Sequence, residues 1–261
     1  MEFTTLELTI DDAVARICLN RPEMRNAIDD VFIRELCVAF AEVEAVPGVR
    51  AVVLGARGPA FCAGANLNWM RRAADFTPEQ NLQDAAGLPR MLRTLSESRL
   101  PVIARIQGDV YAGGMGLVAA ADVAIAVEGV HFCLSEVKIG LIPATISPYV
   151  IRAMGARAAQ RYFLTGERFP ADEARRMGLV HEVVTADALD LKVDEVLRNI
   201  VAAGPSAVGE CKRLLRDVTG RPIDSALADE TVRRIAAIRA SDEGLEGLRA
   251  FLEKRKPAWA A

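Results

Sequence analysis

The chain has 261 residues, of which 51% are hydrophobic and 26% are charged, and its formal net charge is -3. This length is enough to bury a core without disulfide bonds or a structural metal. The slightly acidic balance argues against nucleic acid as a main partner, because such a partner requires an excess of basic residues. The composition is that of an ordinary globular protein.

Cysteine and histidine content limits the metal and redox chemistry open to the chain. The five cysteines lack a C-x-x-C pair, so they predict neither a disulfide framework nor a zinc knuckle, and a reducing compartment is the simplest interpretation. His131 and His181 are far apart in sequence and lack the spacing of metal ligands. We therefore expect no bound metal.

The N-terminal sequence "MEFTTLELTIDD" is acidic and alternating, which is not typical of a secretion signal or a transit peptide. Charges or glycines interrupt every apolar run before it reaches the roughly 18 residues that a membrane span needs. We therefore expect a cytoplasmic protein with no membrane partner.

The N-terminal part of the chain predicts a hairpin, a helix and a buried strand. Residues 6–10 and 13–19 alternate between polar and apolar side chains, as in a β-hairpin. Asp29 is placed to cap a helix over 30–45, where apolar residues recur at helical spacing. The β-branched run at 50–56 is typical of a buried strand.

Two glycine-containing loops then each connect a strand to a helix. The loop at 57–66 precedes a helix that starts near Leu67. After a long helix over 81–96, a strand at 101–108 leads through the second glycine turn into a helix of small residues over 114–121. Two strand–turn–helix units in succession predict parallel strands.

The remaining segments complete an α/β fold class with helices gathered at the C-terminus. Strands are expected at 122–127 and 131–135, and a late edge strand at 178–184. From about residue 187 only helical patterns occur. We therefore divide the chain into a core over 1–186 and a C-terminal helical region over 187–261.

Both glycine turns lie where a strand ends and a helix begins, so their backbone N–H groups lack helical partners and lie at the positive end of the helix dipole. The N–H groups of Ala65 in "FCAGAN" and Gly113 in "AGGMG" are candidate oxyanion donors. The alternative is that the glycines serve only tight packing. Neither turn has the spacing of a dinucleotide or phosphate loop, and no G-x-S-x-G elbow is present.

Two acidic residues stand within apolar sequence. Glu136 stands among apolar residues in "HFCLSEVKIGLIPA", and a buried carboxyl has a raised pKa, which suits proton transfer near neutral pH. The alternative, favoured by the residue alone because glutamates are mostly exposed, is a solvated helix-cap glutamate after Ser135. For Asp122 we expect a structural role as an acceptor for backbone donors.

Six segments together resemble the enoyl-CoA hydratase/isomerase (crotonase) superfamily, in its order and spacing and over almost the whole chain: "LNRPEMRNAI", "GPAFCAGANLNWM", "PVIARIQGDVYAGGMGLVAAADVAIA", "FCLSEVKIGLIPATISPYV", "RYFLTGERFPADEARRMGLVHEVV" and "FLEKRKPAW". The resemblance implies a spiral of ββα turns that binds acyl-CoA, followed by C-terminal helices that build a homotrimer or a dimer of trimers. It also implies an acyl-CoA thioester as substrate, with no metal or redox cofactor.

The resemblance also implies roles for individual residues. Ala65 and Gly113 would form the oxyanion hole, and Glu136 would be the catalytic acid. Gly140, Ile142 and Pro143 match the turn that shapes the acyl pocket. The positions that match the coenzyme A site are Arg25, Ala63, Ala65, Leu67, Phe251 and Lys254, of which the last two belong to a tail that can serve a neighbouring subunit.

One position departs from the pattern of the superfamily. Its hydratases usually carry two glutamates, and the first of them falls on Gly116, which has no side chain. The segments "ANLNWM", "GGMGLVAAAD" and "SEVKIGLIPATISPYVI" are most similar to bacterial methylglutaconyl-CoA hydratases of leucine or acyclic-terpene breakdown, in which this position is often not an acid. Water would then be oriented by Glu136 itself or by the distal carboxylate of the substrate.

Four functions therefore stay open. The first is an enoyl-CoA hydratase, and the second is a 3-enoyl to 2-enoyl-CoA isomerase, for which a single acid–base residue is sufficient. The third is a non-catalytic acyl-CoA-binding or RNA-binding member, and decarboxylation of a dicarboxylyl thioester would use the same oxyanion hole. The acyl chain that the protein accepts depends on the shape of the pocket, and so on the loops around Trp69, Met70, Leu88 and Met91. Each of these four residues can instead belong to the core.

Overall fold

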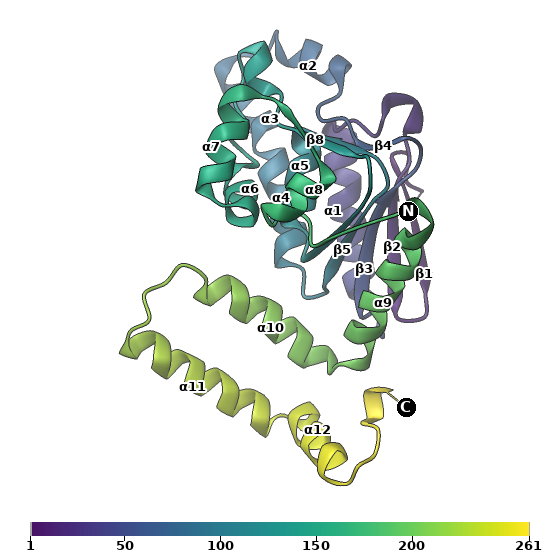
Figure 1. Ribbon diagram of the computed structural model, residues 1–261, viewed down its shortest axis with the longest axis vertical. Helices are drawn as coiled ribbons and strands as arrows, with labels where there is room; N and C mark the ends of the chain where they lie inside the picture. The colour runs from purple at the N-terminus through teal and green to yellow at the C-terminus, as the bar shows by residue number, and fades with distance from the viewer. Residues whose placement is uncertain (1, 261) are drawn as a thin grey trace.

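The chain winds through two β-sheets, and the computed structural model describes it from residue 2 to residue 260 (Figure 1). The larger sheet contains, in spatial order, β1 (Leu6–Asp11), β2 (Val14–Leu19), β3 (Ala51–Ala56), β5 (Val102–Ile106), β7 (Val123–Val127) and β10 (Glu182–Val184). The smaller sheet contains β4 (Ala60–Cys62), β6 (Asp109–Tyr111), β8 (His131–Cys133) and β9 (Arg168–Pro170).

Successive turns of the chain place one strand in each sheet. Strands β3, β5 and β7 pair in parallel in the larger sheet, and β4, β6 and β8 pair in parallel in the smaller one. Strands β1 and β2 form an antiparallel hairpin, and β10 lies parallel to β7 at the sheet edge. The predicted hairpin, parallel strands and late edge strand are confirmed.

The helices fall into two groups along the chain. The first group is α1 (Asp30–Ala45), α2 (Leu67–Ala73), α3 (Pro78–Ala85), α4 (Gly87–Glu97), α5 (Gly113–Ala120), α6 (Ser147–Met154), α7 (Ala156–Thr165) and α8 (Ala171–Arg176). The second is α9 (Leu189–Ala202), α10 (Pro205–Val218), α11 (Ser225–Ala240) and α12 (Asp242–Leu252). Short 3-10 helices are η1 (Pro22–Met24), η2 (Glu136–Ile139), η3 (Ala186–Ala188) and η4 (Ala258–Ala260). Within residues 2–260, no helix is both long and apolar enough to cross a bilayer.

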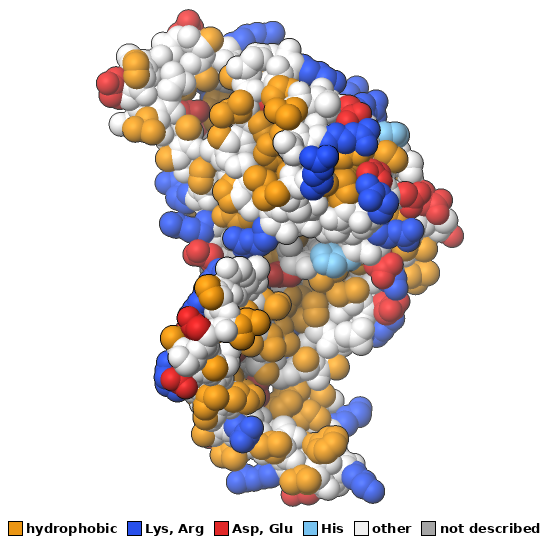
Figure 2. All heavy atoms as spheres, turned by 60° about the vertical axis from the view of Figure 1, so that its left-hand side comes forward, with side chains coloured by type: hydrophobic (Ala, Val, Ile, Leu, Met, Phe, Trp, Pro, Cys, Tyr) orange, Lys and Arg blue, Asp and Glu red, His pale blue; other side chains and the backbone are white. Residues whose placement is uncertain are grey.

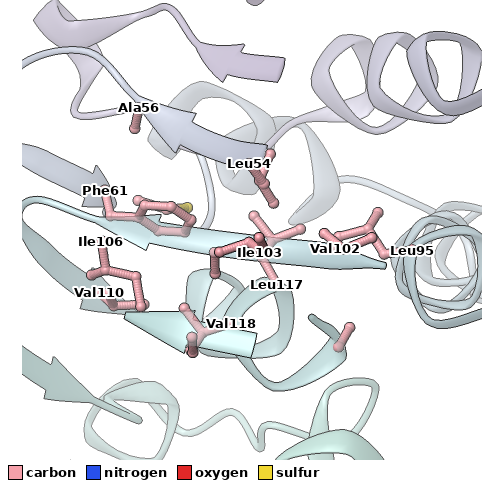
Figure 3. Packing of buried hydrophobic residues seen from close by; sticks show 14 of the residues in the cluster. Leu54, Ala56, Phe61, Leu95, Val102, Ile103, Ile106, Val110, Leu117 and Val118 are labelled. Atoms are coloured by element: carbon pink, nitrogen blue, oxygen red, sulfur yellow. The ribbon is translucent and has the colours of Figure 1, made fainter. Parts of the chain in front are cut away.

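The hydrophobic core joins the two sheets to helix α5. Leu54 of β3 and Ile103 of β5 lie beside Leu117 of α5, and Phe61 of β4 packs in the same cluster (Figure 3). These four side chains have no exposed surface. Burying a large apolar side chain contributes about 1.5–3 kcal/mol, so this cluster fixes the position of α5 relative to both sheets.

The prediction of a single helix over 81–96 is wrong. The segment forms α3 and α4, and the helix is interrupted at Ala86. Thr77 and Gln80 form a reciprocal capping box that starts α3 independently of α4. Helix α3 buries no residue, whereas α4 buries Met91 and Leu92 in the core, so only the second helix is positioned by core packing.

The two glycine loops are also more regular than predicted. Each contains a three-residue strand, β4 in the first loop and β6 in the second, and Cys62 pairs with Val110. A strand of this length is too short to give an alternating pattern. The extended conformation of β4 and β6 comes from pairing with a distant segment, and the local sequence does not predict that pairing.

The C-terminal helices form an arm that extends from the body of the molecule (Figure 1). Helix α9 packs against the larger sheet, whereas α10, α11 and α12 lie below it in this view. Lys212 of α10 joins the arm to the core, because its Nζ lies 2.7 Å from Asp122 Oδ2 and also donates to the carbonyl of Leu100. Asp122 accepts the Val102 N–H at 2.7 Å, which confirms its predicted role as an acceptor for backbone donors.

Candidate active site

A cavity of about 510 Å³ opens between the two glycine loops, η2 and helices α2 to α4. Its wall is mainly apolar, and Asp84 and Glu136 are the only ionisable side chains among the described residues that line it. The lining residues are Ile28, Ala63, Ala65, Leu67, Trp69, Met70, Asp84, Ala85, Leu88, Ala112, Gly113, Ser135, Glu136, Ile139, Leu141, Ile142, Pro143, Thr145 and Ile146.

Glycine is required in both loops because the loops touch through their backbones. A Cβ added at Gly64, where φ is +87°, would lie 2.8 Å from the Cβ of Ala112. A Cβ added at Gly114 would lie 2.8 Å from the Cβ of Cys62. Real Cβ atoms do not approach this closely, so side chains here would push the two loops apart. The close approach places Ala65 and Gly113 on the wall of one cavity.

The N–H groups of Ala65 and Gly113 are available to a ligand. Within the described part of the chain, neither donates to a protein acceptor. Gly113 is the first residue of α5, so the helix dipole adds to its N–H. The preceding Ala112 has φ +46° and ψ -118°, a conformation that costs about 1–3 kcal/mol for a residue with a Cβ. Strain of this kind is typical of a backbone that is held for function.

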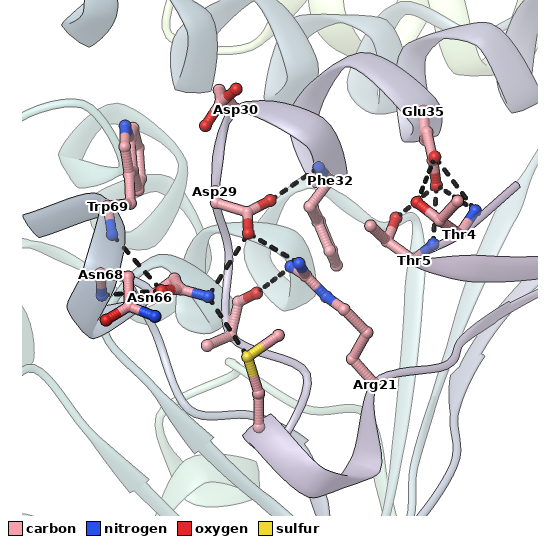
Figure 4. Close-up of polar contacts among 12 residues, drawn as sticks. Thr4, Thr5, Arg21, Asp29, Asp30, Phe32, Glu35, Asn66, Asn68 and Trp69 are labelled. Carbon is pink, nitrogen blue, oxygen red and sulfur yellow. Dashed lines mark hydrogen bonds and ion pairs between the residues drawn. The ribbon is translucent and has the colours of Figure 1, made fainter. Parts of the chain in front are cut away.

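A polar network supports the loop that carries Ala65 (Figure 4). The Asp29 carboxylate accepts from Arg21 Nη1 at 2.6 Å and from Asn66 Nδ2 at 3.4 Å. Burial on its own raises the pKa of Asp29, but hydrogen bonds from Arg21 and the Phe32 N–H outweigh it and hold the pKa below its usual value. The sequence predicted Asp29 only as a helix cap, and its second role as the centre of this network was missed.

Glu136 is the acid of the cavity. It begins η2, and its Oε2 is buried without a hydrogen-bond partner among the described residues. Burial raises the pKa of Glu136 above its ordinary value. The interpretation of this residue as a solvated helix cap is wrong, because Glu136 lines the cavity and the Ser135 side chain makes no capping hydrogen bond. A raised pKa increases the share of the protonated form at a given pH, which suits a proton donor.

Gly116 lies inside α5, and no room remains for a side chain there. A Cβ at this position would lie 2.6 Å from Ile146 Cγ2 and 3.1 Å from Leu92 Cδ1. Ile146 thus occupies the space where a first acid would start, and it lines the cavity itself. The sequence lacks the first glutamate at position 116, and the packing around Gly116 leaves no space for one.

The other residues predicted for coenzyme A fall into two sets. Ala63 and Leu67 line the cavity, and the Ala63 N–H donates to the carbonyl of Arg25 at 2.9 Å, so Arg25 lies on the adjoining loop. Phe251 and Lys254 lie at the C-terminal arm, at the opposite end of the molecule from α2 (Figure 1). A role for these two residues stays a prediction that requires a neighbouring subunit.

Most of the residues predicted to shape the acyl pocket line the cavity, but one belongs to the core. Trp69, Met70 and Leu88 line the cavity, whereas Met91 is fully buried in the core. Ile142 and Pro143 line it from the segment after η2. Asp84 is a cavity residue that sequence reasoning missed, because an aspartate in a polar, exposed helix gives no signal.

The family model for enoyl-CoA hydratase/isomerase matches residues 9–261. This chain belongs to that family. Enoyl-CoA hydratase EchA19 of Mycobacterium tuberculosis is 32% identical over 245 residues, which cover 92% of this chain and 91% of the relative. The chain is therefore an enzyme of the enoyl-CoA hydratase/isomerase type.

Solved structures support the same assignment for the fold. An enoyl-CoA hydratase from Shewanella pealeana is 42% identical, with a TM-score of 0.96 over 99% of this chain and 97% of its own. Pseudomonas aeruginosa AtuE is 36% identical, with a TM-score of 0.94 over 99% of this chain and all of its own (100%). The α/β fold of this family member is the crotonase fold.

Replacing Glu136 with glutamine tests the acid of this enoyl-CoA hydratase/isomerase. Loss of a general acid costs about 100-fold or more, so we expect turnover of an enoyl thioester to fall by at least that factor. Because burial raises the pKa of Glu136 in the folded state, the ionised carboxylate destabilises the wild type as pH rises above 4.5, the ordinary value. The free energy of unfolding of Glu136→Gln should then equal or exceed that of the wild type at pH 8, as measured in urea. Full activity of this variant would remove Glu136 from the mechanism.

The packing at Gly116 predicts a stability effect that depends on Ile146. Alanine gains about 1 kcal/mol of helix propensity over glycine, but overpacking costs about 1–3 kcal/mol. We expect Gly116→Ala to destabilise the wild type by about 1 kcal/mol and to stabilise an Ile146→Ala background by a similar amount. Urea unfolding of the four proteins measures this difference, and an equal effect in both backgrounds would contradict it.

Proposed function

We propose that the protein adds water to the double bond of a 2-enoyl-CoA thioester. The observation that carries this proposal is the convergence of three groups on one cavity: the free N–H groups of Ala65 and Gly113, and the carboxyl of Glu136 with its raised pKa. Membership of the enoyl-CoA hydratase/isomerase family supports a thioester as the group that enters this cavity.

The proposed chemistry follows from these three groups. The thioester oxygen accepts hydrogen bonds from the two backbone N–H groups, which stabilise the enolate that forms when water attacks C3. A preorganised donor of this kind is worth about 3–4 kcal/mol in the transition state. Glu136 then delivers its proton to C2 of the enolate, and burial, which raises the pKa of this carboxyl above its ordinary value, favours the protonated form that this step needs.

A branched substrate such as 3-methylglutaconyl-CoA is the finer proposal. It is supported by the resemblance of three segments to methylglutaconyl-CoA hydratases and by the apolar wall that Leu67, Met70 and Leu88 provide. The described lining contains no lysine, arginine or histidine to pair with the second carboxylate of this substrate. Crotonyl-CoA, whose acyl chain lacks both the branch and the second carboxylate, is therefore the informative comparison.

Isomerisation of a 3-enoyl-CoA to a 2-enoyl-CoA is a second candidate. It is favoured by Gly116, because Ile146 fills the place of a first acid and leaves Glu136 as the acid on that side of the cavity. One carboxyl that moves a proton between two carbons through an enolate is enough for this reaction.

Mass spectrometry of separate incubations distinguishes these functions. The substrates are 3-methylglutaconyl-CoA, crotonyl-CoA and a 3-enoyl-CoA, each with the wild type and with Glu136→Gln as the control. We expect the mass of the first two to increase by one water with the wild type only. An unchanged mass with a shifted double bond in the third would favour the isomerase. Tight binding of all three with no product would contradict both enzymes.

We also propose that the protein assembles as a trimer or a dimer of trimers through its C-terminal arm. Hydrophobic side chains gather along the arm in Figure 2. Those that are more than half exposed in one chain include Leu215, Ile223, Val232, Ile235, Phe251 and Leu252. Covering such side chains is a common basis of symmetric assembly. Light scattering at micromolar concentration should give at least three times the mass of one chain, and a monomer would contradict the proposal.

A further inference from the structure

The cavity contains a second carboxylate that the proposed function does not yet use. Asp84 is the penultimate residue of α3 and lines the cavity together with Glu136. Trp69 of α2 donates its indole Nε1–H to Asp84 Oδ1 at 2.9 Å. No donor among the described residues contacts Asp84 Oδ2. One oxygen of the carboxylate is thus fixed by the protein, and the other is left for a ligand.

If the hydrogen bond from Trp69 to Asp84 served only to join α2 to α3, the carboxylate would not need to lie on the cavity wall. The other acidic residue of α3, Glu79, is exposed and lies outside the cavity lining. Asp84 is half-buried, and its partner Trp69 is also half-buried and also lines the cavity. Asp84 is thus a carboxylate in a mainly apolar wall, and the hydrogen bond from Trp69 engages only one of its two oxygens.

Hydration requires two proton-handling events at the two carbons of the double bond. Water must lose a proton as its oxygen attacks C3, and C2 must gain a proton. Glu136 supplies the proton for C2 in the proposed function. Gly116 has no side chain, and Ile146 fills the space beside it, so no acid from α5 receives the proton from water.

Resting on the proposed hydratase function, we propose that Asp84 is the second catalytic carboxylate, which binds the attacking water and takes its proton, with Trp69 as its positioning residue. It is the only ionisable side chain besides Glu136 in the described lining, and it comes from a different wall, formed by α2 and α3.

The proposed step balances without any further reagent. The oxygen of water forms a bond to C3 while one of its O–H bonds breaks and that proton moves to Asp84 Oδ2. The π electrons of C2=C3 move into the enolate, whose oxygen accepts from the N–H groups of Ala65 and Gly113. The enolate then takes the proton of Glu136 at C2. Exchange with solvent water removes the proton from Asp84 and returns one to Glu136.

Two reactions of the full-length protein separate Asp84 from Glu136. Hydration of crotonyl-CoA needs both carboxylates under this proposal. Exchange of the C2 protons of butyryl-CoA in heavy water needs only Glu136 and the oxyanion donors, because no water attacks C3. The variant is Asp84→Asn, and the matched control is Glu79→Gln, which removes the same charge from the same helix outside the cavity.

We expect Asp84→Asn to lower kcat for hydration by about 100-fold or more, the usual contribution of a general base, while KM and the exchange rate change by less than about threefold. Glu79→Gln should leave both reactions unchanged. Trp69→Phe should lower kcat for hydration by about tenfold and spare the exchange, because the carboxylate stays but loses its fixed orientation.

Other outcomes overturn the proposal in distinguishable ways. Full hydration by Asp84→Asn would make Asp84 a bystander. Equal loss of hydration and exchange would make it a structural or substrate-binding residue. A wild-type protein that exchanges the protons of butyryl-CoA but hydrates neither crotonyl-CoA nor 3-methylglutaconyl-CoA would overturn the hydratase function, and the role of Asp84 with it.

Discussion

The close contact between two backbone loops is the constraint on which the rest of the site depends. Gly64 and Gly114 let the loop after β4 and the start of α5 approach to a distance that no Cβ permits. The N–H groups of Ala65 and Gly113 then belong to the wall of one cavity. The strained backbone at Ala112 is part of the cost of this arrangement, and the buried cluster around Leu117 offsets it by fixing α5 against both sheets.

The site also depends on the groups that the protein leaves unpaired. Glu136 Oε2 is buried without a partner, the two loop N–H groups have no protein acceptor within the described chain, and one oxygen of Asp84 has no donor there. By contrast, both carboxylate oxygens of Asp29 accept hydrogen bonds within the supporting network. Groups with protein partners thus surround a small set of groups that have none and are open to a ligand.

Local sequence was sufficient for the elements whose pattern is long or whose turn chemistry is distinctive. The hairpin, the helix capped by Asp29 and the parallel strands were predicted from alternation, capping and β-branched runs. The strands β4 and β6 and the break between α3 and α4 were missed, because each depends on pairing or packing with distant segments. Asp84 was missed for the same reason, since only the fold brings α3 to the cavity.

The ion pair between Lys212 and Asp122 gives the C-terminal arm a second influence on the molecule. Asp122 lies just beyond the end of α5, the helix whose first residue is Gly113, and Lys212 also reaches the backbone carbonyls that precede the start of β5. One lysine therefore joins the arm to the segment that follows the C-terminal end of α5. In the proposed assembly, a subunit contact to α10 would therefore act through Lys212 on Asp122, two residues after the end of the helix that begins with Gly113.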